Sequence, residues 1–189
     1  MPVRIVLLFL FGISQLLFLT SCGYRFGSGE LSSNYRTVTV PFVLGDLDGS
    51  FTSALIHQLS LSGEFEYVRE GGSLVLKVNL TDFRDENIGF RYDRKKRGDL
   101  TKSVIPTETR ITAFAEVSLV EACTGKVVLG PAKIMASVDF DHDYYSSRNG
   151  VNIFSLGQLG DIDAAHEAVN TPLYRALAQK LVDYVCQSW

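Results

Sequence analysis

The side chains most able to carry catalysis or to bind a metal are three histidines, and their surroundings argue against both roles. They are His57, His142 and His166. His142 stands in an acidic stretch, DFDHD at 139–143, but this is no EF-hand loop, because Tyr144 occupies its sixth position and Gly150 its twelfth. The sequence contains no HExxH, CxxC, GxSxG or P-loop motif. We therefore expect no catalytic site, metal or cofactor, and interpret the acidic stretch as a solvated strand end and loop.

The most positive stretch of the chain is 91–102, with the sequence RYDRKKRGDLTK. It holds six basic and two acidic residues, whereas the formal charge of the whole chain is −3. A positive segment on an acidic domain is a candidate site for a polyanion, and Phe90 and Tyr92 add apolar contact beside the charge. This mixture suits a phosphorylated glycolipid better than a nucleic acid. The candidate phosphate-binding residues are Arg91, Arg94, Lys95, Lys96, Arg97 and Lys102. The alternative is a solvated loop that binds no ligand.

The N-terminus has the pattern of an export signal. Arg4 precedes the run 5–19, whose 15 residues are apolar except for Gly12, Ser14 and Gln15. A bilayer core needs about 20 apolar residues, so the run is short for a permanent span. A positive start, a short apolar centre and small residues at its end are typical of a secretory signal peptide. The alternatives are an N-terminal membrane anchor and a buried helix.

The apolar run ends in Leu-Thr-Ser-Cys at 19–22, which resembles the lipobox of bacterial lipoproteins. The resemblance implies cleavage after residue 21 and acylation of Cys22 by a diacylglycerol and an N-acyl chain, a combination that anchors a protein stably. Gly23 follows instead of an Asp retention signal, which implies the outer membrane, facing the periplasm. The alternative is an ordinary signal peptide with an incidental Cys. Residues 22–34 are rich in Gly and Ser and are interpreted as a flexible, lipid-anchored tether.

The remaining chain, 35–189, is long enough for one domain. Hydrophobic residues make up 46% and charged residues 21%, which excludes a disordered tail and a collagen-like fibre. The acidic balance argues against a general nucleic-acid binder. Cys123 and Cys186 remain after processing, and the sequence leaves open whether they pair or stay as separate thiols.

Hydrophobic periodicity predicts an α+β fold in the order β-α-β-β-β-β-α. We expect a mostly antiparallel sheet of four to five strands with two helices packed on one face. Pro41 predicts that the first strand lies at a sheet edge or breaks there. Ser50 is expected to cap the first helix, and Pro172 to kink or restart the last, with Thr171 as a possible cap. The expected strands are 35–43, 65–69, 73–83, 108–121 and 127–140, the helices 50–61 and 163–186, and the irregular segments 84–106 and 141–160.

The whole layout resembles the LPS-assembly lipoprotein (LptE) family. The matching features are CGYRF at 22–26, TVTVPF at 37–42, the alternation over 74–80, and the strand and turn over 109–126. The resemblance implies a non-enzymatic plug inside a large outer-membrane β-barrel, LptD in that system. It also implies help in assembling the barrel and contact with lipopolysaccharide on its way to the cell surface. The competing hypotheses are a scaffold or chaperone lipoprotein that does not bind lipopolysaccharide, a surface adhesin and a periplasmic enzyme.

Overall fold

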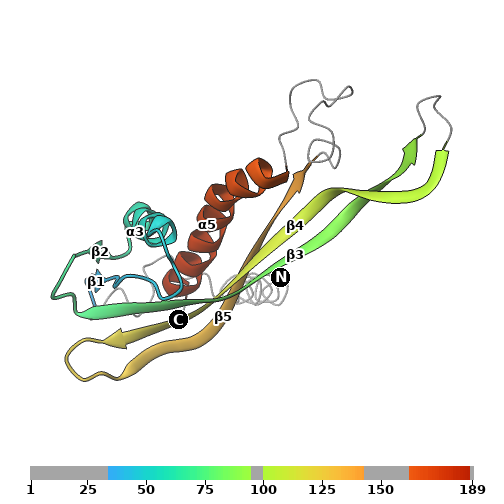
Figure 1. The fold of residues 1–189 in the computed structure, drawn as a ribbon. Coiled ribbons are helices and arrows are strands. Elements are labelled where there is room, and N and C mark those ends of the chain that lie inside the picture. Colours follow the sequence, from blue (N-terminus) through green and yellow to red (C-terminus); the bar gives the residue numbers. More distant parts are fainter. Residues whose placement is uncertain (1–33, 95–99, 143–161, 188–189) are drawn as a thin grey trace, which may run out of the picture.

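The computed structural model describes residues 34–94, 100–142 and 162–187 (Figure 1). The predicted signal peptide, Cys22 and the predicted tether up to residue 33 therefore lie outside the described residues. Within the described ranges, no helix is both long and apolar enough to cross a lipid bilayer.

The sheet has five strands in the spatial order β2-β1-β3-β4-β5. The short strand β1 is parallel to both of its neighbours, whereas β3 pairs antiparallel with β4 and β4 antiparallel with β5. This confirms the predicted α+β class with a mostly antiparallel sheet. The strands are β1 (Thr37–Thr39), β2 (Glu66–Tyr67), β3 (Leu74–Arg94), β4 (Leu100–Glu121) and β5 (Val127–Asp141).

Two helices, α3 (Ser50–Ser62) and α5 (Ile162–Cys186), pack together on one face of this sheet, as expected (Figure 1). Each helix buries side chains at the predicted four-residue spacing, because this spacing keeps them on one side of a helix. The buried residues at this spacing are Phe51, Leu55 and Leu59 in α3 and Val169, Leu173, Leu177, Leu181 and Val185 in α5, and Thr52, Ala178 and Val182 are buried beside them. They meet the alternate residues of β3 and β4, including Leu74, Leu76, Val78, Ile111, Val117 and Leu119.

The first strand is shorter than predicted and lies at no edge. It ends at Thr39, before Pro41, so the predicted break is confirmed. The predicted edge position is wrong, because β1 lies between β2 and β3. Proline ends the ladder there, since it offers no N–H. The chain returns to β3 only at Leu44, which bridges Asn79.

The expectation of an irregular segment at 84–106 is wrong for most of its length. β3 continues to Arg94 and β4 begins at Leu100. A register shift between Leu80 and Asp82 reverses the phase of β3, so that Phe83, not Asp82, lies opposite the buried Ala113. A bulge of this kind moves the apolar positions by one residue, and the simple alternation disappears from the sequence.

The helix boundaries also differ from the expectation at two points. Ser50 is the first residue of α3 and does not cap it, and the N-cap position is Gly49. The helix α5 runs through Pro172 without restarting at Thr171. Val169 and Leu173 are buried on either side of this proline, and their packing offsets the hydrogen bond that proline removes.

Candidate functional site

The candidate site for a polyanion lies on a two-stranded arm formed by the far ends of β3 and β4. The strand on the other side of β4, β5, ends at Asp141, which pairs with Glu108. Among the described residues, the ladder beyond that pair holds only 90–94 of β3 and 100–107 of β4, and we call them the arm. In Figure 1 the arm extends past the end of α5, away from the two helices.

One face of the arm exposes large apolar side chains. Phe90 pairs with Pro106 and Tyr92 with Val104, so these side chains share a face, because residues two apart in a strand point the same way. The exposed fractions are 59% for Phe90, 62% for Tyr92 and 54% for Val104. Apolar groups clustered in this way on a projecting ribbon are typical of an interaction surface.

The structure places three of the six predicted phosphate-binding residues on this arm. Arg91 is exposed and lies between Phe90 and Tyr92 in the strand. Arg94 ends β3 opposite Leu100, and Lys102 belongs to β4. The other three, Lys95, Lys96 and Arg97, lie outside the described residues, in the five-residue connection between the two strand ends.

The base of the arm is closed by a hydrogen-bonded group in which Thr109 and His142 are buried and Asn87 is exposed. The Thr109 hydroxyl donates to Asn87 Oδ1 at 2.9 Å and therefore accepts from His142 Nε2 at 2.8 Å. His142 is only 2% exposed, and its ring packs against Phe140 with centroids 5.8 Å apart. The expectation of a solvated strand end is thus wrong for His142, which continues the inward alternation of β5. That alternation was visible in the sequence.

The described part of the acidic stretch around His142, residues 139–142, does not form a metal site. Asp139 pairs with Arg110, and the residues of β5 alternate between the two faces, which separates Asp139 and Asp141 from the inward His142. Across the described part of the chain, no group of three His, Cys, Asp or Glu residues could hold a metal. His57 is exposed on α3, beside a groove of about 690 Å³ between α3 and α5. The side chain of His166 lies outside the described set.

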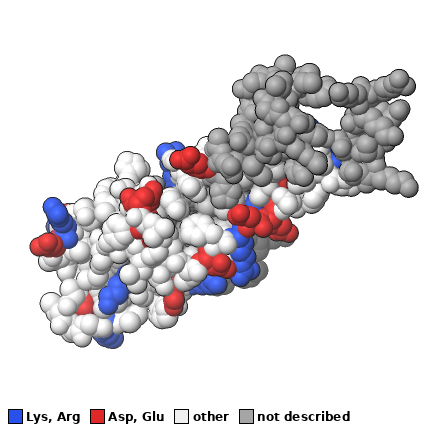
Figure 2. Space-filling view, in the orientation of Figure 1, with Lys and Arg blue, Asp and Glu red and all other residues white. Residues whose placement is uncertain are grey.

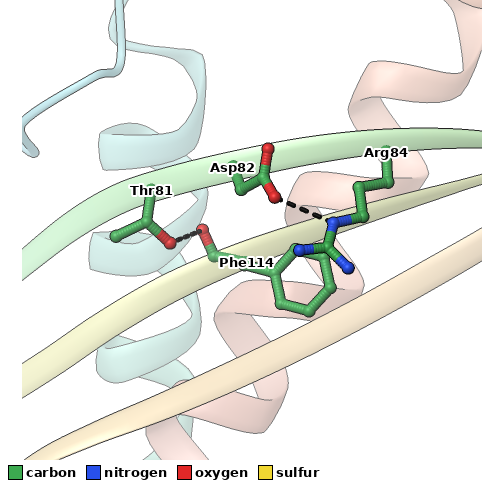
Figure 3. Close-up of polar contacts among 4 residues, drawn as sticks. All are labelled: Thr81, Asp82, Arg84 and Phe114. Carbon is green, nitrogen blue, oxygen red and sulfur yellow. Dashed lines mark hydrogen bonds and ion pairs between the residues drawn. The ribbon is translucent and has the colours of Figure 1, made fainter.

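The sheet face opposite the helices carries charged side chains around one aromatic ring, Phe114. The Arg84 guanidinium lies 4.9 Å and the Lys133 ammonium 4.8 Å from the centre of this ring. Figure 3 shows Arg84 over Phe114 and paired with Asp82 at 2.9 Å, while the Thr81 hydroxyl donates to the Phe114 carbonyl at 3.3 Å. Cations over an aromatic face are attracted to its π electrons. This face is therefore the polar one, as the half-apolar strands predict.

A second ion pair on the polar face joins β4 to β5. Arg110 donates to both carboxylate oxygens of Asp139, each at 2.7 Å. These bonds hold the pKa of Asp139 below its ordinary value and raise the pKa of Arg110. Both groups are solvent-accessible, so the pair adds little to stability.

The two cysteines of the domain are free thiols. Cys123 is exposed in the turn after β4, and Cys186 is half-buried at the end of α5. Burial raises the pKa of the Cys186 thiol. The sequence left open whether the two cysteines pair or stay separate, and in the structure they are separate thiols.

No protein-family model and no curated protein matches this chain. Solved structures with a similar arrangement of elements include lipoprotein B of Nitrosomonas europaea, at 12% identity over 87% of this chain and 90% of that one, with a TM-score of 0.49. A minor lipoprotein of Acinetobacter baumannii is 10% identical over 81% and 94%, with a TM-score of 0.47. Rare lipoprotein B of Shewanella oneidensis is 11% identical over 79% and 91%, with a TM-score of 0.44. A likeness of this degree carries no argument about ligands or partners.

Proposed function

We propose that this protein is an outer-membrane lipoprotein, anchored through Cys22 on the periplasmic side, that plugs an LptD-like β-barrel and contacts lipopolysaccharide. The observation that carries the proposal is the projecting arm, on which the exposed rings of Phe90 and Tyr92 share one face and the exposed Arg91, between them in the strand, lies on the other. Lipopolysaccharide combines phosphate groups with acyl chains, so a protein surface that contacts it needs cations and apolar side chains together. The arm offers both.

The charge distribution supports a contact with phosphate. Six of the 17 basic residues of the mature chain fall within 91–102, together with two acidic ones. An arginine can donate two parallel hydrogen bonds to a phosphate, and a lysine adds a compact charge. The order of the strands already brings Arg91, Arg94 and Lys102 onto the same arm.

The polar sheet face supports the barrel partner. Two cations lie over Phe114, of which Arg84 pairs with Asp82, and a charged surface of this kind suits a wet, polar lumen better than lipid. The helices cover the opposite face of the sheet, so the polar face is available to a partner (Figure 1).

The experiment is a lipopolysaccharide-binding titration with the full mature chain. Reversal of Lys95, Lys96 and Arg97 to Glu is expected to weaken binding, and added salt to weaken the unaltered protein more than the variant, because fewer attractive charges remain to be screened. Reversal of Lys77, Lys126 and Lys133, exposed lysines outside the arm, is the matched control and is expected to change binding far less. Equal affinity of the arm variant and the unaltered protein would favour a scaffold or chaperone that does not bind lipopolysaccharide.

A further inference from the structure

A second exposed apolar cluster lies far from the arm, in the connection between β1 and α3. We call residues 40–49 the α3 entry loop. Three of its side chains are largely exposed, with fractions of 63% for Phe42, 67% for Leu44 and 100% for Leu47. Single exposed leucines are common in proteins, but here three large apolar side chains are exposed within six residues of one loop, and we call these three side chains the patch.

The loop is held in place by hydrogen bonds to two neighbouring elements. The Leu44 backbone bonds β3 on both sides, donating to the Val78 carbonyl at 3.3 Å and accepting from the Leu80 N–H at 2.8 Å. Gly45 has a φ of 87°, and a Cβ at this position would lie 2.8 Å from the Leu80 carbonyl oxygen. The close approach to β3 therefore needs glycine, and the patch is presented by a fixed backbone.

Asp46 fixes the other end of the loop to the start of α3. It is 2% exposed and accepts hydrogen bonds from the N–H groups of Phe51 and Thr52. The Val43 N–H donates to the Thr52 hydroxyl at 3.2 Å. The chain thus buries its polar groups on the inside of the loop and directs Phe42, Leu44 and Leu47 outward.

The charge of the loop indicates what kind of surface would cover the patch. Its only charged residues are Asp46, which is buried in the cap, and Asp48, which accepts hydrogen bonds from Ser50. The loop itself contains no cation that could attract an acidic partner, and Leu47 has no charged side chain next to it in the sequence other than Asp46 and Asp48. Figure 2 shows that the end of the molecule that holds α3 and β1 is mostly uncharged, with Lys, Arg, Asp and Glu side chains scattered over it. Leucine and phenylalanine without charge suit the interfacial layer of a zwitterionic bilayer.

We propose that Phe42, Leu44 and Leu47 insert into the surface of the membrane that holds the lipid on Cys22. The inference rests on the anchor of the proposed function. The chain from Cys22 to Asn34 can span at most about 42 Å when fully extended, which keeps the domain near the bilayer. Leu44 lies ten residues beyond Asn34, at most about 35 Å further. A second contact next to a tether of this length forms at high local concentration, so three side chains are enough.

The test uses the full mature lipoprotein reconstituted through its own lipid into phosphatidylcholine vesicles. Trp189 is the only tryptophan, so Trp189→Phe combined with Leu47→Trp gives a single fluorescent probe in the loop. Ala122→Trp in the same background is the matched control, in the exposed turn after β4. We expect brominated phosphatidylcholine to quench the probe at position 47 at least about twofold more than the control, because an inserted side chain lies 5–10 Å below the surface.

Equal quenching of the two probes, or none at position 47 in an acylated and vesicle-bound protein, would overturn this proposal and leave the anchor standing. A photo-crosslink from position 47 to a co-purifying barrel in cells would also overturn it, because the patch would then contact protein. Protein that carries no acyl label and stays in the aqueous phase would overturn the anchor first, and the proposal with it.

Discussion

Thr52 donates two hydrogen bonds to the Asp46 carboxylate, one from its backbone N–H at 2.7 Å and one from its hydroxyl at 2.6 Å. Both residues are buried, and Asp46 precedes the helix that it caps by four positions. Helix N-termini leave N–H groups without partners, and a carboxylate placed there satisfies them. Because Asp46 accepts these bonds, α3 can begin directly after Gly49, which is in the left-handed conformation and has no side chain to cap the helix.

Asp46→Ala is expected to lower the free energy of unfolding by roughly 1–3 kcal/mol, because it removes the cap and leaves a buried hydroxyl and two N–H groups without their acceptor. Urea unfolding followed by circular dichroism measures the loss. Asp48→Ala is the matched control two residues away, and its exposed carboxylate predicts a much smaller change. Equal loss in the two variants would show that Asp46 has no special role.

A pH-dependent contact joins the start of the domain to the turn between β4 and β5. The Tyr35 hydroxyl donates to Glu121 at 3.0 Å, and Thr124 donates to the other carboxylate oxygen. The bonds from Thr124 and then Tyr35 hold the pKa of Glu121 below its ordinary value of 4.5. The contact with Glu121 raises the pKa of Tyr35 above 10.0.

The directions of these two pKa shifts determine how the stability of the fold changes with pH. A lowered carboxyl pKa gives stability that is present above pH 4.5 and is lost as the pH falls through the lower pKa of the folded state. A raised tyrosine pKa gives stability that is present below pH 10.0 and is lost as the pH rises through the higher folded value. Tyr35→Phe is expected to raise the pKa of Glu121 in a carboxyl NMR titration, and Thr124→Ala to raise it more. Tyr67→Phe serves as control, and an unmoved Glu121 titration in Tyr35→Phe would contradict the contact.

Substitutions on the apolar face of the arm are expected to weaken lipopolysaccharide binding without lowering the stability of the fold. Phe90→Ser together with Tyr92→Ser removes exposed rings, so we expect the urea midpoint to move little. Binding of lipopolysaccharide is expected to weaken by about tenfold, because acyl-chain contact contributes about 0.8 kcal/mol per buried CH₂ group. Met135→Ser, an exposed apolar residue of β5 outside the arm, is the control. An affinity that stays at the level of the control would remove the apolar face from the site.

The free thiols predict two rates of modification. Cys123 is exposed, whereas Cys186 is half-buried and its pKa is raised by burial, so little of it is thiolate at neutral pH. A thiol reagent is expected to modify Cys123 at least about tenfold faster than Cys186, and higher pH to accelerate the slow phase. Cys123→Ser should remove the fast phase alone. A fast phase that persists in that variant would show that Cys186 is more open than the structure describes.

Periodicity in the sequence was sufficient to predict the core of this fold. The alternation over 74–80 and the four-residue spacing in both helices each follow from one dry face, and most of the predicted positions are buried. In α5 the residues buried beside the stripe are Ala178 and Val182, whereas the predicted Ala176 is only partly buried. The arm could not be predicted in the same way. Beyond β5 the ribbon does not join the core under the helices, although Ile105 is buried there, and the bulge before Asp82 reverses the phase, so the sequence carries no regular pattern there.

The local details that were missed depend on the path of the chain. Sequence rules look for a cap directly before a helix and therefore favoured Ser50, whereas Asp46 reaches α3 only because its loop turns back beside β3. For the candidate site, the sequence identified the cations and the two aromatic residues. It could not show that Phe90, Tyr92 and Val104 share a face, because this depends on pairing between strands.

The most direct test of the account is mass spectrometry of the native protein after extraction in mild detergent. We predict a chain that begins at an acylated Cys22, in a stoichiometric complex with one large outer-membrane β-barrel, with lipopolysaccharide retained. Cys22→Ala, as control, should leave the signal peptide attached and the acyl groups absent. An unacylated chain recovered alone, free of any barrel, would contradict the central claim.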